Sequence, residues 1–225
     1  MAPVLGYWDT RGRAQMIRNL LIYKNNVAFV DKRYSYGPPP YYTGTEWEAD
    51  KFSLGLKFPN LPYYIDGDLK LTQSLAIMRY LSRKHDLAGR TEEEVTQLDL
   101  LEQQSLDLFM KLARTAFEPN LEEARKNYEA SLNNELEPWA ELLHGRTWAL
   151  GGRLTYVDFI LYESLDWIRD FGPDTFQRFS TLLKYLNKFE ELPNIKQYMA
   201  SQKYRKYPFL RRKWTWAAKE TSSQF

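Results

Sequence analysis

The sequence predicts a two-domain protein, in which an α/β domain of about 85 residues precedes an all-α domain. In the first part, short strand-like runs alternate with helical patterns, and prolines and glycines separate them. Farther along, apolar residues recur mainly at helical spacing. We therefore place the first domain at residues 1–85, a short polar linker at 86–90 and the second domain at 91–225.

The first elements read as strand, turn, helix and strand. Residues 3–8 form a short apolar run, and Arg11-Gly12 follows as a turn. A helix is indicated by apolar residues at helical spacing, namely Met16, Ile17, Leu20 and Leu21. Residues 27–33 then alternate between apolar and polar side chains, which predicts a second strand.

A protruding loop and a β-hairpin complete the first domain. The loop is predicted at residues 36–42, because three consecutive prolines remove backbone donors and fix φ. The turn at residues 66–68 joins strands at 63–65 and 69–72, and Ser74 is placed to cap the next helix. The order βαβ, loop, ββα is that of a thioredoxin-like unit.

Several helices are predicted in the second domain. A long one begins at Thr91, with one face formed by Val95, Leu98, Glu102, Ser105, Phe109, Leu112 and Ala116. Others are expected at residues 121–143, from Thr155, and at 179–191 and 194–202. Thr155 and Asp158 have the spacing of a capping box, to which we assign stability rather than catalysis.

Composition excludes several classes of function. The chain has no cysteine, so disulfide scaffolds, thiolate metal sites and cysteine nucleophiles are excluded. Its two histidines, His85 and His144, are too few for a histidine-rich metal site. A net charge of +2 favours neither nucleic acid nor membrane, and no run of 18 apolar residues or signal peptide is visible. We expect a cytoplasmic protein with no metal.

Several motifs of the first domain resemble those of one enzyme family. They are Leu5-Gly6-Tyr7-Trp8-Asp9, Lys51-Phe52, Leu54-Gly55-Leu56, Phe58-Pro59-Asn60-Leu61-Pro62-Tyr63, Ile65-Asp66-Gly67, Leu71-Thr72-Gln73-Ser74 and Ala76-Ile77. Together they resemble glutathione transferases of the mu class, in register to about Trp216. The resemblance implies a thioredoxin-like glutathione-binding domain and an all-helical domain with the electrophile site and a C-terminal tail. It also implies a detoxifying homodimer in which Phe58 inserts into the partner subunit.

The resemblance assigns catalysis to Tyr7. Free thiols have a pKa near 8.5, so only a few per cent of the co-substrate glutathione is thiolate at neutral pH, and the thiolate is the nucleophile. A neutral tyrosine donates a hydrogen bond without needing a balancing charge. Tyr7, in the first strand, matches the tyrosine that holds the glutathione sulfur as a thiolate.

The resemblance also assigns the rest of the glutathione site. Gln73 and Ser74 match residues that bind the γ-glutamyl carboxylate, where a helix N-terminus favours negative charge. Leu61 would pair its backbone with the tripeptide like an added strand. Residues expected at the glycyl carboxylate are Trp47 and Lys51, with Trp8 and Asn60 nearby. Asp107, on the polar face of the long helix, would reach the ammonium of the neighbour's glutathione.

The electrophile pocket implied by the resemblance is apolar with one cation. It comprises Thr10, Arg13, Leu106, Phe109, Met110, Phe117 and Leu210. Two positions depart from the family. Gly44 stands where an arginine often binds the glycyl carboxylate, and Phe117 stands where a tyrosine often assists epoxide opening. We expect aromatic substitution to survive better than epoxide addition.

Two other functions fit parts of the sequence. A ligandin-like protein with the transferase fold would carry hydrophobic molecules without turnover. Alternatively, basic residues interleave with aromatic ones in the tail at 203–216, a pattern typical of single-stranded nucleic-acid binding. The nearly neutral chain disfavours the second function, and Tyr7 disfavours the first.

Overall fold

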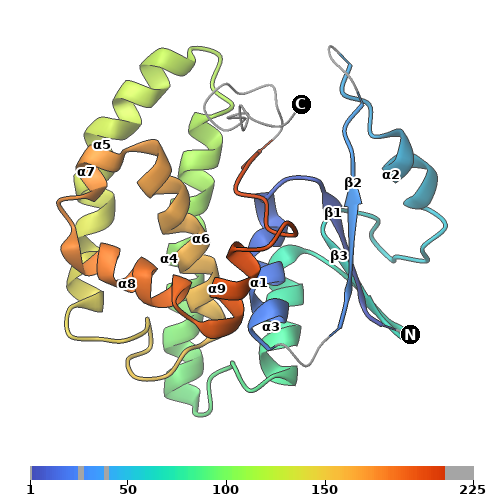
Figure 1. Cartoon of the computed structure of the whole chain (residues 1–225), viewed down its shortest axis with the longest axis horizontal. Helices are drawn as coiled ribbons and strands as arrows, with labels where there is room; N and C mark the ends of the chain where they lie inside the picture. The colour runs from blue at the N-terminus through green and yellow to red at the C-terminus, as the bar shows by residue number, and fades with distance from the viewer. Residues whose placement is uncertain (1, 25–27, 38–40, 211–225) are drawn as a thin grey trace. The chain divides into compact units, whose positions relative to one another are not determined.

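The computed structural model describes residues 2–24, 28–37 and 41–210 of the 225-residue chain, which fall into two compact units (Figure 1). One unit runs to Leu81 and also includes the segment 200–210, and the other spans Ser82–Met199. The linker predicted at 86–90 lies inside the second unit, and the domain limits inferred from the sequence stay a prediction. Parts of the predicted second strand, loop and tail lie outside the described residues, namely Val27, Pro38 to Pro40 and the residues beyond Leu210.

The first unit is built on a four-stranded mixed sheet in the order β2-β1-β3-β4. The strands are β1 (Val4–Trp8), β2 (Val30–Tyr34), β3 (Tyr63–Asp66) and β4 (Leu69–Thr72). β1 runs parallel to β2 and antiparallel to β3, and β3 and β4 form the expected hairpin. This topology confirms the thioredoxin-like prediction and places Tyr7 opposite Arg33 on the neighbouring strand.

Short helices accompany this sheet, with α1 and α3 on one of its faces and α2 on the other (Figure 1). They are the 3-10 turn η1 (Gly12–Ala14), α1 (Gln15–Tyr23), α2 (Thr45–Asp50) and α3 (Ser74–Lys84). α1 buries the four apolar residues that predicted it. α2 was not predicted, because six residues are too few for a periodic pattern.

The second unit is helical throughout, as predicted. Its helices are α4 (Glu92–Thr115), α5 (Leu121–Leu143), α6 (Tyr156–Phe171), α7 (Pro173–Phe176), α8 (Ser180–Glu190) and α9 (Pro193–Met199). α4 and α6 pack side by side, and α6 is buried along nearly its whole length. The four-residue α7 was missed, since a single turn beginning with proline carries no apolar periodicity.

The face of α4 predicted from helical spacing is buried except at its first residue. The residues from Leu98 to Ala116 in that set are buried, whereas Val95 is 37% exposed. Val95 lies in the first turn of the helix, which begins at Glu92 and carries three acidic residues. The helix therefore enters the core about one turn later than its apolar pattern suggested.

The capping box at the start of α6 is confirmed. The backbone N–H of Thr155 donates to Asp158 Oδ2 at 2.8 Å, and the reciprocal bond to the Thr155 side chain is also present. Both residues are fully buried. The box satisfies amide groups that have no partner inside the helix and fixes where α6 begins.

Candidate active site

Tyr7 lies in β1 with its side chain 8% exposed. Its hydroxyl oxygen accepts a hydrogen bond from the backbone N–H of Arg13 at 3.1 Å. Burial raises the pKa of Tyr7 above its ordinary value, and the Arg13 N–H and the charges of Arg13 and Arg18 oppose that rise. The phenol is therefore neutral at physiological pH. Because it accepts the bond from Arg13, its own hydrogen remains available to donate elsewhere.

Gly12 makes room for the Tyr7 hydroxyl beside the Arg13 amide, and sequence reasoning missed this role. Its φ is +38°, and a Cβ atom at this position would lie 2.5 Å from the Tyr7 hydroxyl oxygen. Real Cβ atoms do not approach a neighbour so closely, so only glycine fits without displacing the ring. The sequence feature that indicates this role is the Arg11-Gly12 turn, which predicts only a connection between strand and helix when it is considered alone.

A pocket of about 300 Å³ opens in the same unit. Its lining brings together Arg13, Asn60, Leu61, Pro62, Gln73 and Ser74. Arg13 therefore belongs to this pocket while its backbone amide binds Tyr7. The Leu61–Pro62 peptide bond is cis, and the Leu61 N–H donates to Asn60 Oδ1 at 2.8 Å.

The pocket contains the start of α3. Ser74 is the first residue of that helix, and Gln73 accepts the first helical bond from the Ile77 N–H at 3.0 Å. Gln73 therefore occupies the cap position that we predicted for Ser74. Its φ of +72° is unusual for a residue with a side chain and is typical of functional sites. Backbone amides at this helix end favour an anionic group.

The residues expected at the glycyl carboxylate surround α2. Trp47 is buried in a cluster with Tyr34, Leu56 and Tyr63. Lys51 forms an ion pair with Glu48. The indole of Trp47 is therefore packed in the core of this unit, whereas the ammonium group of Lys51 is partly exposed.

Gly44, the departure noted in the sequence, lies against Trp8. A Cβ atom on Gly44 would approach the Trp8 ring to 2.5 Å. Trp8 itself is stacked on Tyr36, with ring centroids 4.2 Å apart. A larger side chain at position 44 would thus have to displace this aromatic pair. The packing of Trp8 against position 44 is therefore suited to a glycine there and not to an arginine.

The remaining predicted residues are divided between the two units. Thr10, Arg13 and Leu210 belong to the first, and Leu106, Phe109, Met110 and Phe117 to the second. Phe117 is exposed, whereas Phe109 is buried against Trp167. Asp107 is exposed on α4 with Gln103 and Lys111, as expected. The electrophile pocket and the role of Asp107 stay predictions.

Among residues 2–24, 28–37 and 41–210, no group of three or more histidine or acidic side chains could hold a metal ion. Within the same ranges, none of the helices combines the length and apolarity needed to cross a membrane.

A thioredoxin-like unit with a polar pocket near a buried tyrosine, joined in sequence to a helical unit, defines the fold class of the cytosolic glutathione transferases. Comparison with known families agrees. Residues 3–83 match the glutathione S-transferase N-terminal domain, and residues 106–202 match the C-terminal domain. The chain belongs to the glutathione S-transferase family.

Individual relatives place it near the mu class. A glutathione S-transferase of Mesocricetus auratus is 45% identical over 204 residues, which cover 91% of this chain and 93% of the relative. Glutathione S-transferase Mu 2 of Mus musculus is 42% identical over 97% of this chain and all of its own length. Among solved structures, the glutathione S-transferase Blo t 8 superposes with a TM-score of 0.80 at 38% identity, covering 92% of this chain and 96% of its own. The predicted fold class and the mu-class resemblance are thus confirmed.

Proposed function

We propose that this protein conjugates glutathione with hydrophobic electrophiles and that Tyr7 holds the glutathione sulfur as a thiolate. The observation that carries the proposal is the Tyr7 hydroxyl, which is buried, neutral and bonded to the amide of a residue that lines the polar pocket. Lowering a thiol pKa by two units requires about 2.7 kcal/mol of preference for the anion. A hydrogen bond donated to a charged group supplies about 1.5–3 kcal/mol.

The pocket suits the γ-glutamyl end and the backbone of glutathione. The α3 amides at Ser74 and the side chain of Gln73 offer donors to its carboxylate. Leu61 lines the pocket and is assigned to pair its backbone with the tripeptide, and its N–H now donates to Asn60 Oδ1. A bound peptide that pairs with that N–H would replace the Asn60 side chain. Trp47, Lys51 and Trp8 are assigned to the glycyl end.

The finer features of the family are also part of the proposal. We assign a homodimer with Phe58 inserted into the partner, and Asp107 acting on the partner's glutathione. Phe58 is 69% exposed, as an inserting side chain requires in a single chain. We assign the electrophile site to Thr10, Arg13, Leu106, Phe109, Met110, Phe117 and Leu210. We also assign the protein to the cytoplasm, with a role in detoxification.

The decisive experiment is the pH profile of conjugation to an activated chloroarene for the parent, Tyr7→Phe and the control Tyr41→Phe. Tyr41 is an exposed tyrosine in the same unit. We expect the parent and the control to share a thiol pKa well below 8.5, and Tyr7→Phe to be slower at neutral pH with a higher apparent pKa. Binding of the chloroarene without turnover in the parent would instead support the ligandin-like function.

A further inference from the structure

The segment 200–210 packs against the turn that follows β1. The backbone N–H of Arg11 donates to the Pro208 carbonyl at 3.0 Å, and the N–H of Gly12 donates to the Phe209 carbonyl at 2.8 Å. Phe209 is fully buried, and the guanidinium of Arg11 lies 4.7 Å from the centre of its ring. The chain therefore returns to its first unit after the helical unit and closes over residues 9–12.

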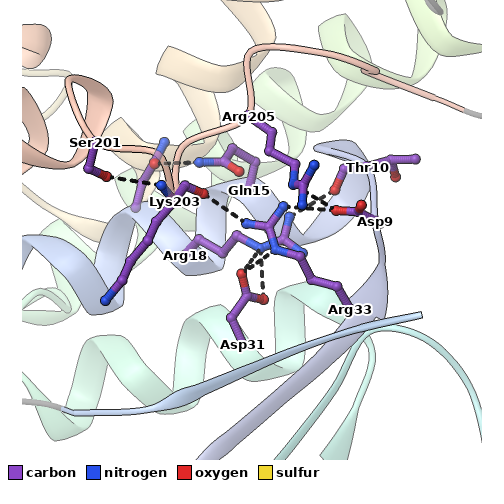
Figure 2. A network of polar contacts seen from close by, with 10 residues as sticks. Asp9, Thr10, Gln15, Arg18, Asp31, Arg33, Ser201, Lys203 and Arg205 are labelled. Carbon is purple, nitrogen blue, oxygen red and sulfur yellow. Dashed lines mark hydrogen bonds and ion pairs between the residues drawn. The ribbon is translucent and has the colours of Figure 1, made fainter. Parts of the chain in front are cut away.

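Arg33 connects three segments at this point (Figure 2). Its Nε donates to Asp31 at 2.7 Å within β2, and one terminal nitrogen donates to Asp9 at 3.1 Å. The other terminal nitrogen donates to the Lys203 carbonyl at 3.3 Å. A guanidinium has donors in a fixed planar fork, so these bonds set the relative positions of β2, the turn and the C-terminal segment.

Other side chains hold the same turn from each side. Arg205 pairs with Asp9 at 3.1 Å, and so joins the C-terminal segment to the turn a second time. Arg18, which is fully buried, pairs with Asp31 at 3.0 Å and donates to the Thr10 carbonyl at 2.8 Å. Figure 2 shows these side chains converging from α1, β2 and the C-terminal segment.

The turn held in this way is the one that contacts Tyr7. Gly12 leaves no room for a Cβ beside the tyrosine hydroxyl, and the Arg13 amide donates to that hydroxyl at 3.1 Å. We propose that Arg33 is a positioning residue for Tyr7, which acts by fastening the segment 200–210 to the turn at residues 9–13. This inference rests on the proposed function, because it concerns the placement of the hydroxyl that stabilises the thiolate.

The charge of Arg33, without any positioning role, is a competing explanation for an effect on the thiol pKa. The described cluster contains the guanidinium groups of Arg18, Arg33 and Arg205 and the carboxylates of Asp9 and Asp31, so it carries a net positive charge. Positive charge near the sulfur would favour a thiolate without any role in positioning. The variants Arg33→Lys and Arg33→Gln separate the accounts, because lysine keeps the charge and loses the planar fork.

The measurement is an ultraviolet titration of the thiolate of bound glutathione, with the KM for glutathione measured beside it. We expect both Arg33 variants to raise the thiol pKa by about one unit, which is a tenfold change in the ionisation constant. KM should change less than the thiol pKa, because Arg13 is the one pocket residue on this turn and the others, among them Leu61, Gln73 and Ser74, lie on other segments. The control is Arg90→Gln, which removes an exposed ion pair to Asp86 and should match the parent.

A second readout follows the C-terminal segment directly. Trypsin cleaves after lysine and arginine, and Lys203, Arg205 and Lys206 lie in this segment. Cleavage there should be several-fold faster in both Arg33 variants than in the parent and in Arg90→Gln. If Arg33→Gln does not fold, Arg205→Gln takes its place, because Arg205 is half exposed and its loss removes a single ion pair in the network.

Failure of this inference and failure of the proposed function would give different results. If Arg33→Lys keeps the parent's thiol pKa while Arg33→Gln raises it, the charge account replaces the positioning account. If neither the Arg33 variants nor Arg205→Gln shift the pKa, the inference is wrong while the proposed function stands. If bound glutathione in the parent has the pKa of a free thiol, the proposed function itself is wrong.

Discussion

At the scale of single residues, the environment of Tyr7 determines how it titrates. Burial raises the pKa of its phenol above 10 in the folded protein. The contribution of this proton to folding stability is therefore fully present below pH 10, the ordinary value, and is lost as pH rises through the raised pKa. We expect a difference titration between the ligand-free parent and Tyr7→Phe to show no tyrosinate signal from Tyr7 up to pH 10. A transition below pH 9 would contradict the burial argument.

Gly12 permits the second prediction at this scale. We expect Gly12→Ala to lower kcat/KM by about 100-fold, because a displacement of roughly 1 Å in a reacting group has that effect. The left-handed φ of +38° adds strain on the order of 1 kcal/mol. The matched control is Gly152→Ala, since a Cβ on Gly152 meets nothing within 4 Å. Equal activity in the two variants would show that the Tyr7 hydroxyl tolerates movement.

At the scale of elements, the start of α6 depends on one buried carboxylate. Asp158 accepts bonds from the Ala149 N–H at 2.8 Å, from the Thr155 N–H at 2.8 Å and from the Tyr185 hydroxyl at 2.9 Å. Asp158→Ala would leave these buried donors unmatched, so we expect a loss of about 3 kcal/mol or more in the free energy of unfolding. Urea unfolding followed by circular dichroism measures it.

The control for α6 is Asp174→Ala, which removes an exposed acid from the first turn of α7. We expect that change to stay within about 0.5 kcal/mol of the parent, as for ordinary surface substitutions. Similar unfolding midpoints for both variants would mean that the capping box contributes little. The loss should appear without any change in the thiol pKa, because Asp158 and Tyr7 belong to different units.

Helices with many periodic residues could be predicted from the sequence, whereas the two shortest α-helices of the described residues, α2 and α7, could not. The limits of α5 agree with the predicted 121–143, because more than six turns of amphipathic pattern define it. α2 and α7 have six and four residues, so packing and not periodicity determines them. Val95 belongs to the predicted face of α4 but is 37% exposed, since apolar spacing does not show where a helix leaves the core.

At the scale of the whole molecule, the candidate site could be predicted only where neighbours in sequence are also neighbours in space. Gln73 and Ser74, or Asn60 to Pro62, were found through local motifs, and the structure brings them into one pocket. The contact between Arg33 and Lys203 joins residues 170 positions apart, and nothing in either local sequence indicates it. Such a network depends on how the chain returns to its first unit, which single-sequence patterns do not encode.

The proposed dimer gives the last prediction. Phe58 is 69% exposed, and an inserted aromatic side chain is the type of residue on which interfaces depend. We expect the parent to sediment at twice 26.8 kDa and Phe58→Ser to shift toward 26.8 kDa. Tyr41→Ser, which removes an aromatic side chain that is 83% exposed, should leave the mass unchanged.

Asp107 then tests whether the dimer completes the site. If its carboxylate acts on the glutathione of the partner subunit, Asp107→Ala should raise the KM for glutathione by about tenfold in the dimer, as expected for a lost charged contact. In the Phe58→Ser background, under conditions where that variant is monomeric, the same change should have no further effect, because the two sites no longer meet. An equal increase in both backgrounds would place Asp107 in a role within its own chain.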